Sequence, residues 1–120
     1  MGINWIDHKG QKIFLIDYSG IKLEKEMIEL VNKAPSYLQD VKPGEKLLML
    51  VDLNNCYTTP GFLEASKKLE KGFLDQFKLK RAVLGITGPK AVLLKGYNLF
   101  TSQKLEPFAT KEEALAYLIK

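Results

Sequence analysis

Apolar positions along the chain form continuous runs that alternate with stripes at helical spacing. The clearest run lies in residues 46–53, where five consecutive apolar side chains precede Asp52. A continuous run bounded by polar residues is typical of an interior parallel strand that helices cover on both faces. Ligands and partners of such sheets bind beyond the carboxyl ends of the strands. We therefore expect any binding or chemistry at residues 52–59.

Four further segments have the pattern of strands. Residues 4–7 and 13–18 flank a short turn and predict an antiparallel hairpin at the start of the sheet. Residues 81–87 form another nearly continuous apolar run. Residues 105–108 predict a short edge strand, because Pro107 has no N–H to donate to a central ladder.

Stripes of apolar residues at helical spacing separate these strands. Thr59 is the expected N-cap of the second helix, with Pro60 in the first turn. Thr110 and Glu113 have the spacing of a capping box, in which Glu113 reaches back to the cap, and they predict the start of the last helix. Helices are expected over residues 23–34, from residue 60 to 73, over residues 90–100 and after residue 110.

The element order β-β-α-β-α-β-α-β-α predicts an α/β fold. Right-handed crossovers would build a mixed sheet of four to five strands, an opening hairpin followed by βα units, covered by about four helices. A chain of 120 residues with 46% hydrophobic composition fits one domain, residues 1–120, with a core that needs no disulfide or metal.

The charge of the chain changes this picture little. The formal net charge is +4, but Arg81 is the only arginine. Arginine is the residue that best forms bidentate hydrogen bonds to bases and phosphates. Most lysines alternate with glutamates, as in residues 22–26 and 67–71, which is typical of solvated helix faces. We therefore expect no nucleic-acid partner.

The protein is expected to be located in the cytoplasm. Cys56 is the single cysteine, so the sequence has no disulfide framework. No stretch approaches the roughly 20 apolar residues of a membrane span or the layout of a signal peptide, so no integral membrane segment is expected.

The strand that ends in Val51-Asp52-Leu53 and leads through a polar loop to a helix resembles the STAS fold of sulfate-transporter and anti-sigma-factor-antagonist domains. Residues 16–20, 82–88 and 110–118 add to the resemblance, which spans nearly the whole chain. It looks closest to the bacterial SpoIIAA-like branch, also described as STAS/SEC14-like. This likeness supports the fold more than the function.

Antagonists of that family carry an Asp-Ser-Ser-Gly run at the start of the helix, where a partner kinase phosphorylates a serine. The matching stretch here reads Thr58-Thr59-Pro60-Gly61, without the aspartate and the serines. Thr58 and Thr59 are the phosphorylation candidates that the resemblance implies. The alternative is that the Thr59 hydroxyl only caps the helix.

Few residues offer catalytic or metal chemistry. His8 lies in the predicted hairpin turn, and the one histidine and one cysteine cannot supply a multi-ligand zinc centre. Cys56 has no base nearby in the sequence, and Asp52 has the position of an aspartate that accepts N–H groups of its own loop. We predict no catalytic residue, no metal, no cofactor and no enzyme.

Three predicted strand ends are expected to converge in a shallow polar site: residues 17–19, residues 52–59 and residues 87–88. The partner or ligand-binding candidates are Tyr18, Ser19, Asp52, Asn54, Asn55, Thr58, Thr59 and Phe62. The site predicts a regulatory module that recognises a protein partner through the loop and helix after the third strand.

The third helix is apolar on nearly every side, so its surface must be covered by the core, by another subunit or by an apolar ligand. Leu93, Tyr97, Leu99 and Phe100 are the candidates for an apolar groove or interface. A homodimer through this helix or through the edge strand is one alternative. A carrier or sensor of a small apolar, lipid-like ligand is the other, and it needs an open groove between the helix and the sheet.

Overall fold

Five strands form one sheet in the order β1-β2-β3-β4-β5 in the computed structural model, which describes residues 2–120. The strands are β1 (Gly2–His8), β2 (Gln11–Asp17), β3 (Lys46–Asp52), β4 (Lys78–Leu84) and β5 (Leu105–Phe108). The α-helices are α1 (Glu24–Lys33), α2 (Pro60–Gly72), α3 (Pro89–Phe100) and α4 (Lys111–Leu118), and the short 3₁₀ helices are η1 (Ala34–Tyr37) and η2 (Leu74–Gln76). The predicted element order and the mixed α/β sheet are confirmed.

The sheet is antiparallel only at its first pair. β1 and β2 form a hairpin whose turn consists of Lys9 and Gly10, with φ angles of 49° and 83°. Both values lie in the left-handed region that a two-residue hairpin turn requires. β2, β3, β4 and β5 are all parallel, and helices make the three crossovers.

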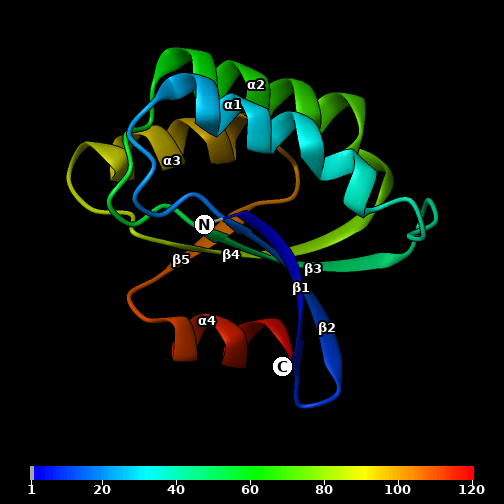
Figure 1. Cartoon of the computed structure of the whole chain (residues 1–120). Coiled ribbons are helices and arrows are strands. Elements are labelled where there is room, and N and C mark those ends of the chain that lie inside the picture. The colour runs from blue at the N-terminus through cyan, green and yellow to red at the C-terminus, as the bar shows by residue number, and fades with distance from the viewer. Residues whose placement is uncertain (1) are drawn as a thin grey trace.

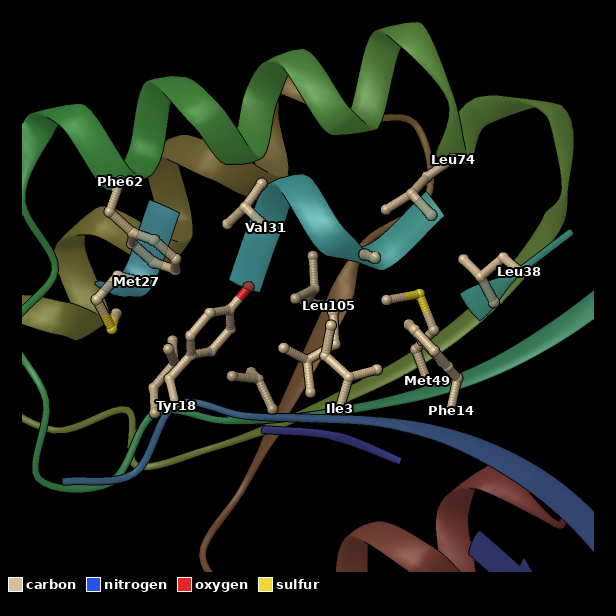
Figure 2. Close-up of a cluster of buried hydrophobic side chains, with 14 of the residues drawn as sticks. Ile3, Phe14, Tyr18, Met27, Val31, Leu38, Met49, Phe62, Leu74 and Leu105 are labelled. Atoms are coloured by element: carbon tan, nitrogen blue, oxygen red, sulfur yellow. The ribbon is translucent and has the colours of Figure 1, made fainter. Parts of the chain in front are cut away.

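Helices cover the two faces of the sheet unequally, as Figure 1 shows. α1, α2 and α3 lie on one face, and α4 lies alone on the other. The larger core fills the space under α1 and α2, where Phe14, Met49 and Leu105 of the sheet meet Met27, Val31 and Leu74 (Figure 2). A second, smaller core packs Ile13, Leu50 and Ala82 against Ala114 and Leu118 of α4.

Some element boundaries differ from the sequence prediction. The fourth strand was predicted at residues 81–87, but it runs over Lys78–Leu84, in register with Lys46–Asp52 of β3. The strand ends where it does because Gly85 has a φ of 83°, which no strand residue adopts. A Cβ at Gly85 would lie 2.5 Å from the backbone nitrogen of Asn54, so the chain passes very close to the loop after β3.

The described chain covers α3 on one side only, so coverage of the rest by another subunit or by a ligand stays a prediction. None of its residues is fully buried, and the side chains of Val92 and Leu99 are 72% and 90% exposed. The helix rests on the sheet and on α2 through one side only, with Leu94 and Tyr97 packed against the larger core.

Candidate partner-binding loop and adjoining cavity

Three strand ends meet at one edge of the sheet, as the sequence predicted. Asp17 at the end of β2 pairs with Asp52 at the end of β3, and Asp52 pairs with Leu84 at the end of β4. The backbone N–H of Tyr18 donates to the carbonyl of Asp52 over 2.9 Å, which holds the segment after β2 to the end of β3. The segments that leave these strands therefore form one continuous polar edge.

The loop after β3, residues 53–59, is held in shape by its own side chains. One carboxylate oxygen of Asp52 accepts from the backbone and side-chain nitrogens of Asn54, at 2.9 and 2.8 Å. Asn55 has a φ of 54°, a conformation that asparagine tolerates better than most residues. The backbone N–H of Gly20 donates to the Asn54 carbonyl over 3.2 Å. Asp52 therefore organises the loop and is not a free base.

The segment after β2 has the same kind of turn. Asp17 accepts from the backbone N–H of Ser19 over 2.9 Å. Partial burial of the Asp17 carboxylate opposes its ionisation, but the hydrogen bonds from Ser19 outweigh that effect and lower its pKa. Ser19 therefore positions Asp17, and the two residues together shape the neighbouring rim of the site.

Tyr57 is the most prominent residue of this loop. Its side chain is 65% exposed although its neighbour Cys56 is buried. The Lys22 ammonium donates to the carbonyl of Asn55 over 2.8 Å and lies 5.2 Å from the centre of the Tyr57 ring. Tyr57 was not predicted as a site residue from the sequence. The signal that could have identified it is the presence of an aromatic residue in a polar loop at a strand end.

The start of α2 is capped as predicted. Thr59 Oγ1 accepts from the backbone N–H of Phe62 over 3.2 Å, and Pro60 occupies the first turn. Thr58 is half-buried beside it and lines the cavity described below. The Thr59 hydroxyl therefore caps the helix, and phosphorylation of Thr58 or Thr59 stays a prediction.

Cys56 is inert in this arrangement. Its side chain is 4% exposed and donates to the carbonyl of Leu53 over 3.3 Å. Burial raises the pKa of the Cys56 thiol, with Lys90 acting against that rise and Asp52 adding to it. His8 is the last residue of β1, at the far end of the hairpin from the strand ends. Cys56 and His8 therefore lie at opposite ends of the sheet and do not form a catalytic pair.

A cavity of about 90 Å³ lies between the sheet, α2 and α3. Val51 and Val83 of the sheet, Phe62 and Leu69 of α2 and Leu93 and Tyr97 of α3 are among its lining residues. Tyr18 and Phe62 were predicted to bind a partner or a ligand. They are 3% and 5% exposed and pack edge to face with ring centres 5.0 Å apart. Figure 2 shows both rings between the sheet and the helices. They can contact a ligand in the cavity but not a partner at the surface.

The candidates on α3 divide into two groups. Leu93 and Tyr97 line the cavity, whereas Leu99 and Phe100 do not. Leu99 is exposed, and Phe100 lies under the ammonium groups of Lys67 and Lys71, at 5.2 and 4.9 Å from its ring centre. Leu99 and Phe100 are therefore outside this cavity, and their role in an interface stays a prediction.

A buried ion pair borders the same cavity. Arg81 of β4 donates to both carboxylate oxygens of Glu70 of α2, at 2.6 and 3.1 Å, and it also donates to the carbonyl of Gln103. Tyr97 and Thr101 add hydroxyl donors to Glu70 at 3.0 and 2.9 Å. Burial and the nearby Glu70 raise the pKa of Tyr97. Glu70 was predicted to lie on a solvated helix face, which is wrong because its side chain is fully buried.

No group of three or more His, Cys, Asp or Glu side chains that could hold a metal ion occurs in residues 2–120. Over the same residues, no helix has both the length and the apolar character that crossing a lipid bilayer requires.

Known proteins resemble this chain in structure. No protein-family model and no curated protein sequence matches it. An uncharacterized protein with a SpoIIAA-like fold from Shewanella loihica PV-4 superposes with a TM-score of 0.72 at 20% identity, over 98% of this chain and 92% of that one. An anti-sigma-factor antagonist (STAS) domain protein from Planctomyces limnophilus superposes with a TM-score of 0.59 at 15% identity, over 100% of both chains. The chain has the SpoIIAA-like STAS fold that its sequence predicted.

Proposed function

We propose that this SpoIIAA-like domain is a non-enzymatic regulatory module that recognises a protein partner through residues 53–59 and the first turn of α2. The observation that carries the proposal is the exposed Tyr57 side chain on a loop that hydrogen bonds hold in place. Tyrosine is enriched among the residues that dominate binding energy in protein interfaces.

The rigidity of the loop favours recognition. A surface that is already ordered loses little conformational entropy on binding, so more of the contact energy appears as affinity. Lys22 supplies a positive charge beside the Tyr57 ring, and this arrangement suits a partner with an acidic or acceptor-rich segment next to an apolar pocket.

Two further points support a binding role. One of the proteins of similar structure is described as an anti-sigma-factor antagonist (STAS) domain protein, a name that refers to action on another protein. In this chain, the carboxylates at the strand ends accept hydrogen bonds from their own loops, and the nearby thiol is buried. These groups build a shaped surface, and we assign no nucleophile, acid or base to it.

The test is a quantitative pull-down from lysate of the source cells with three baits. Wild-type protein, Tyr57→Ala and the matched control Tyr37→Ala are compared, because Tyr37 is also exposed, at 45%, but lies in η1 away from the loop. We expect a protein that binds wild type and Tyr37→Ala to be reduced at least tenfold with Tyr57→Ala. Identical sets for all three baits would show that the loop is not the recognition surface.

Regulation by phosphate at Thr58 or Thr59 stays a prediction. A phosphate there would lie at the N-terminus of α2, where the helix dipole favours negative charge, but it would compete with the capping bond to Phe62. Intact mass spectrometry of the protein purified gently from its own cells tests the idea. A phosphorylated peptide containing Thr58 and Thr59 would support the switch, and an unmodified mass under all growth conditions would count against it.

A second candidate function is the binding of a small apolar ligand. The observation that favours it is the cavity of about 90 Å³ under α3, walled by apolar side chains of the sheet and of two helices. An apolar cavity of roughly 150 Å³ in another protein is large enough to bind benzene, so this cavity suits only a small molecule unless α3 moves. A lipid-sized ligand would require that movement.

The oligomeric state and the subcellular location of the protein are also part of the proposal. The exposed Val92 and Leu99 side chains leave α3 available for a homodimer contact, and β1 leaves one edge of the sheet unpaired within the described chain. We place the module in the cytoplasm, where its one buried thiol would stay reduced. Native mass spectrometry at micromolar concentration distinguishes a monomer from a dimer.

A further inference from the structure

We infer that the cavity between the sheet, α2 and α3 binds a small carboxylate with a short apolar body, and that Lys90 pairs with the carboxylate. This inference rests on the second candidate function above and adds the charge of the ligand to it. Two observations carry it: the partners of Lys90 and the apolar walls of the cavity beside it.

Lys90 is a half-buried cation on the wall of the cavity, in the first turn of α3. Its ammonium donates to the carbonyl of Leu53 over 2.6 Å. An ammonium has three donors, and no carboxylate of residues 2–120 lies within ion-pair distance of this one. A cation withdrawn from water in this way gains most from an anion that enters beside it.

Arg81 is the second cation beside the cavity. Its two terminal nitrogens bind Glu70 and the Gln103 carbonyl, whereas its buried Nε has no acceptor among the described residues. Protein atoms cover that nitrogen, so a ligand in the cavity does not reach it. Glu70 balances the charge of Arg81, so Lys90 is the cation of the cavity wall that has no carboxylate partner among the described residues.

The body of the ligand must be apolar and short. Val51, Val83, Leu69 and Leu93 form much of the wall, and a volume of about 90 Å³ accommodates only a few carbon atoms. None of the α3 residues is fully buried, so a slight outward shift of this helix exposes few apolar contacts and admits a somewhat longer chain. We therefore expect monocarboxylates of about four to six carbons to be the best fit.

The experiment is an NMR titration of methyl-labelled protein with three probes that share one apolar chain: hexanoate, 1-hexanol and hexylamine. We expect hexanoate to shift the methyl signals of Val83 and Leu93 and to bind at least tenfold more tightly than 1-hexanol. Lys90→Met should remove this preference, whereas Lys95→Met, which deletes an exposed lysine of the same helix, should retain it. Leu93→Trp should block all binding, and Val92→Trp, on the exposed side of α3, should not.

The outcomes distinguish the assignment of a carboxylate from the binding of any apolar ligand. If 1-hexanol binds as tightly as hexanoate, or if Lys90→Met keeps the preference for hexanoate, the assignment of a carboxylate is wrong while ligand binding stands. If no probe shifts a methyl signal of the cavity at millimolar concentration, the ligand-binding function itself is wrong. Neither outcome affects the loop at Tyr57, which the pull-down tests separately.

Discussion

Glu70 of α2 and Arg81 of β4 form a bidentate ion pair, at 2.6 and 3.1 Å, in which the two residues are 0% and 2% exposed. Thr101, immediately after α3, adds a hydroxyl hydrogen bond to Glu70. One carboxylate therefore links α2, β4 and the end of α3. Removal of one partner from a buried pair leaves an uncompensated charge, which costs far more than the pair itself contributes.

We expect Glu70→Gln to lower the free energy of unfolding by about 3–5 kcal/mol, because Arg81 would stay buried without a counter-charge. Urea denaturation followed by circular dichroism measures this loss. The double variant Glu70→Leu/Arg81→Met is the control, since it removes both charges and should be more stable than Glu70→Gln. A double variant that is less stable than the single variant would show that the pair is net stabilising.

The N-cap of α2 is expected to contribute about 1 kcal/mol to stability. Thr59→Ala removes the oxygen that accepts from the Phe62 N–H, so the midpoint of urea unfolding should fall. Thr59→Ser keeps the hydroxyl and should stay close to wild type. Equal losses for the two variants would mean that the Thr59 methyl group, and not the cap, is responsible.

Gly85 should not tolerate a side chain. A Cβ there would approach the backbone nitrogen of Asn54 to 2.5 Å, and the φ of 83° is unfavourable for other residues. We expect Gly85→Ala to lower the free energy of unfolding by about 3 kcal/mol or more. Gly44→Ala is the matched control, because Gly44 has a φ of 86° but open space around its Cα. It should cost only about 1–2 kcal/mol from the backbone conformation.

Cys56 should react slowly with thiol reagents in the folded protein. Burial raises the pKa of the thiol, so the thiolate fraction at pH 8 is lower than for an exposed cysteine, and the side chain is 4% exposed. We expect iodoacetamide labelling, followed by mass spectrometry, to be slower by about tenfold or more than in urea-unfolded protein. Comparable rates in the two states would identify a loop that opens readily.

The sheet and the place of the loop could be predicted because they depend on local patterns. Residues 46–53 show a buried strand by their continuous apolar side chains, and the polar residues after Asp52 mark its carboxyl end. The Thr59 cap and the last helix were likewise predicted from short, specific spacings. In the capping box, Glu113 reaches back to the cap as expected, where its carboxylate accepts from the hydroxyl of Thr110.

The buried polar network could not be predicted in this way. Glu70 lies among lysines in a stretch that resembles any solvated helix face, and its partner Arg81 belongs to another element. Only the tertiary arrangement reveals that this one glutamate points inward. What covers α3 could not be predicted for a related reason, because an apolar helix signals that something covers it but not whether the covering surface belongs to the same chain.

The lone position of α4 has a consequence for how the chain is made. One face of the sheet depends for its cover on Ala114 and Leu118, which the ribosome adds after every strand that they protect. Until that helix is synthesised, Ile13, Leu50 and Ala82 face water or a chaperone. We expect a nascent chain arrested before residue 111 to bind a hydrophobic dye, and the emergence of α4 to be the step that ends its exposure to aggregation.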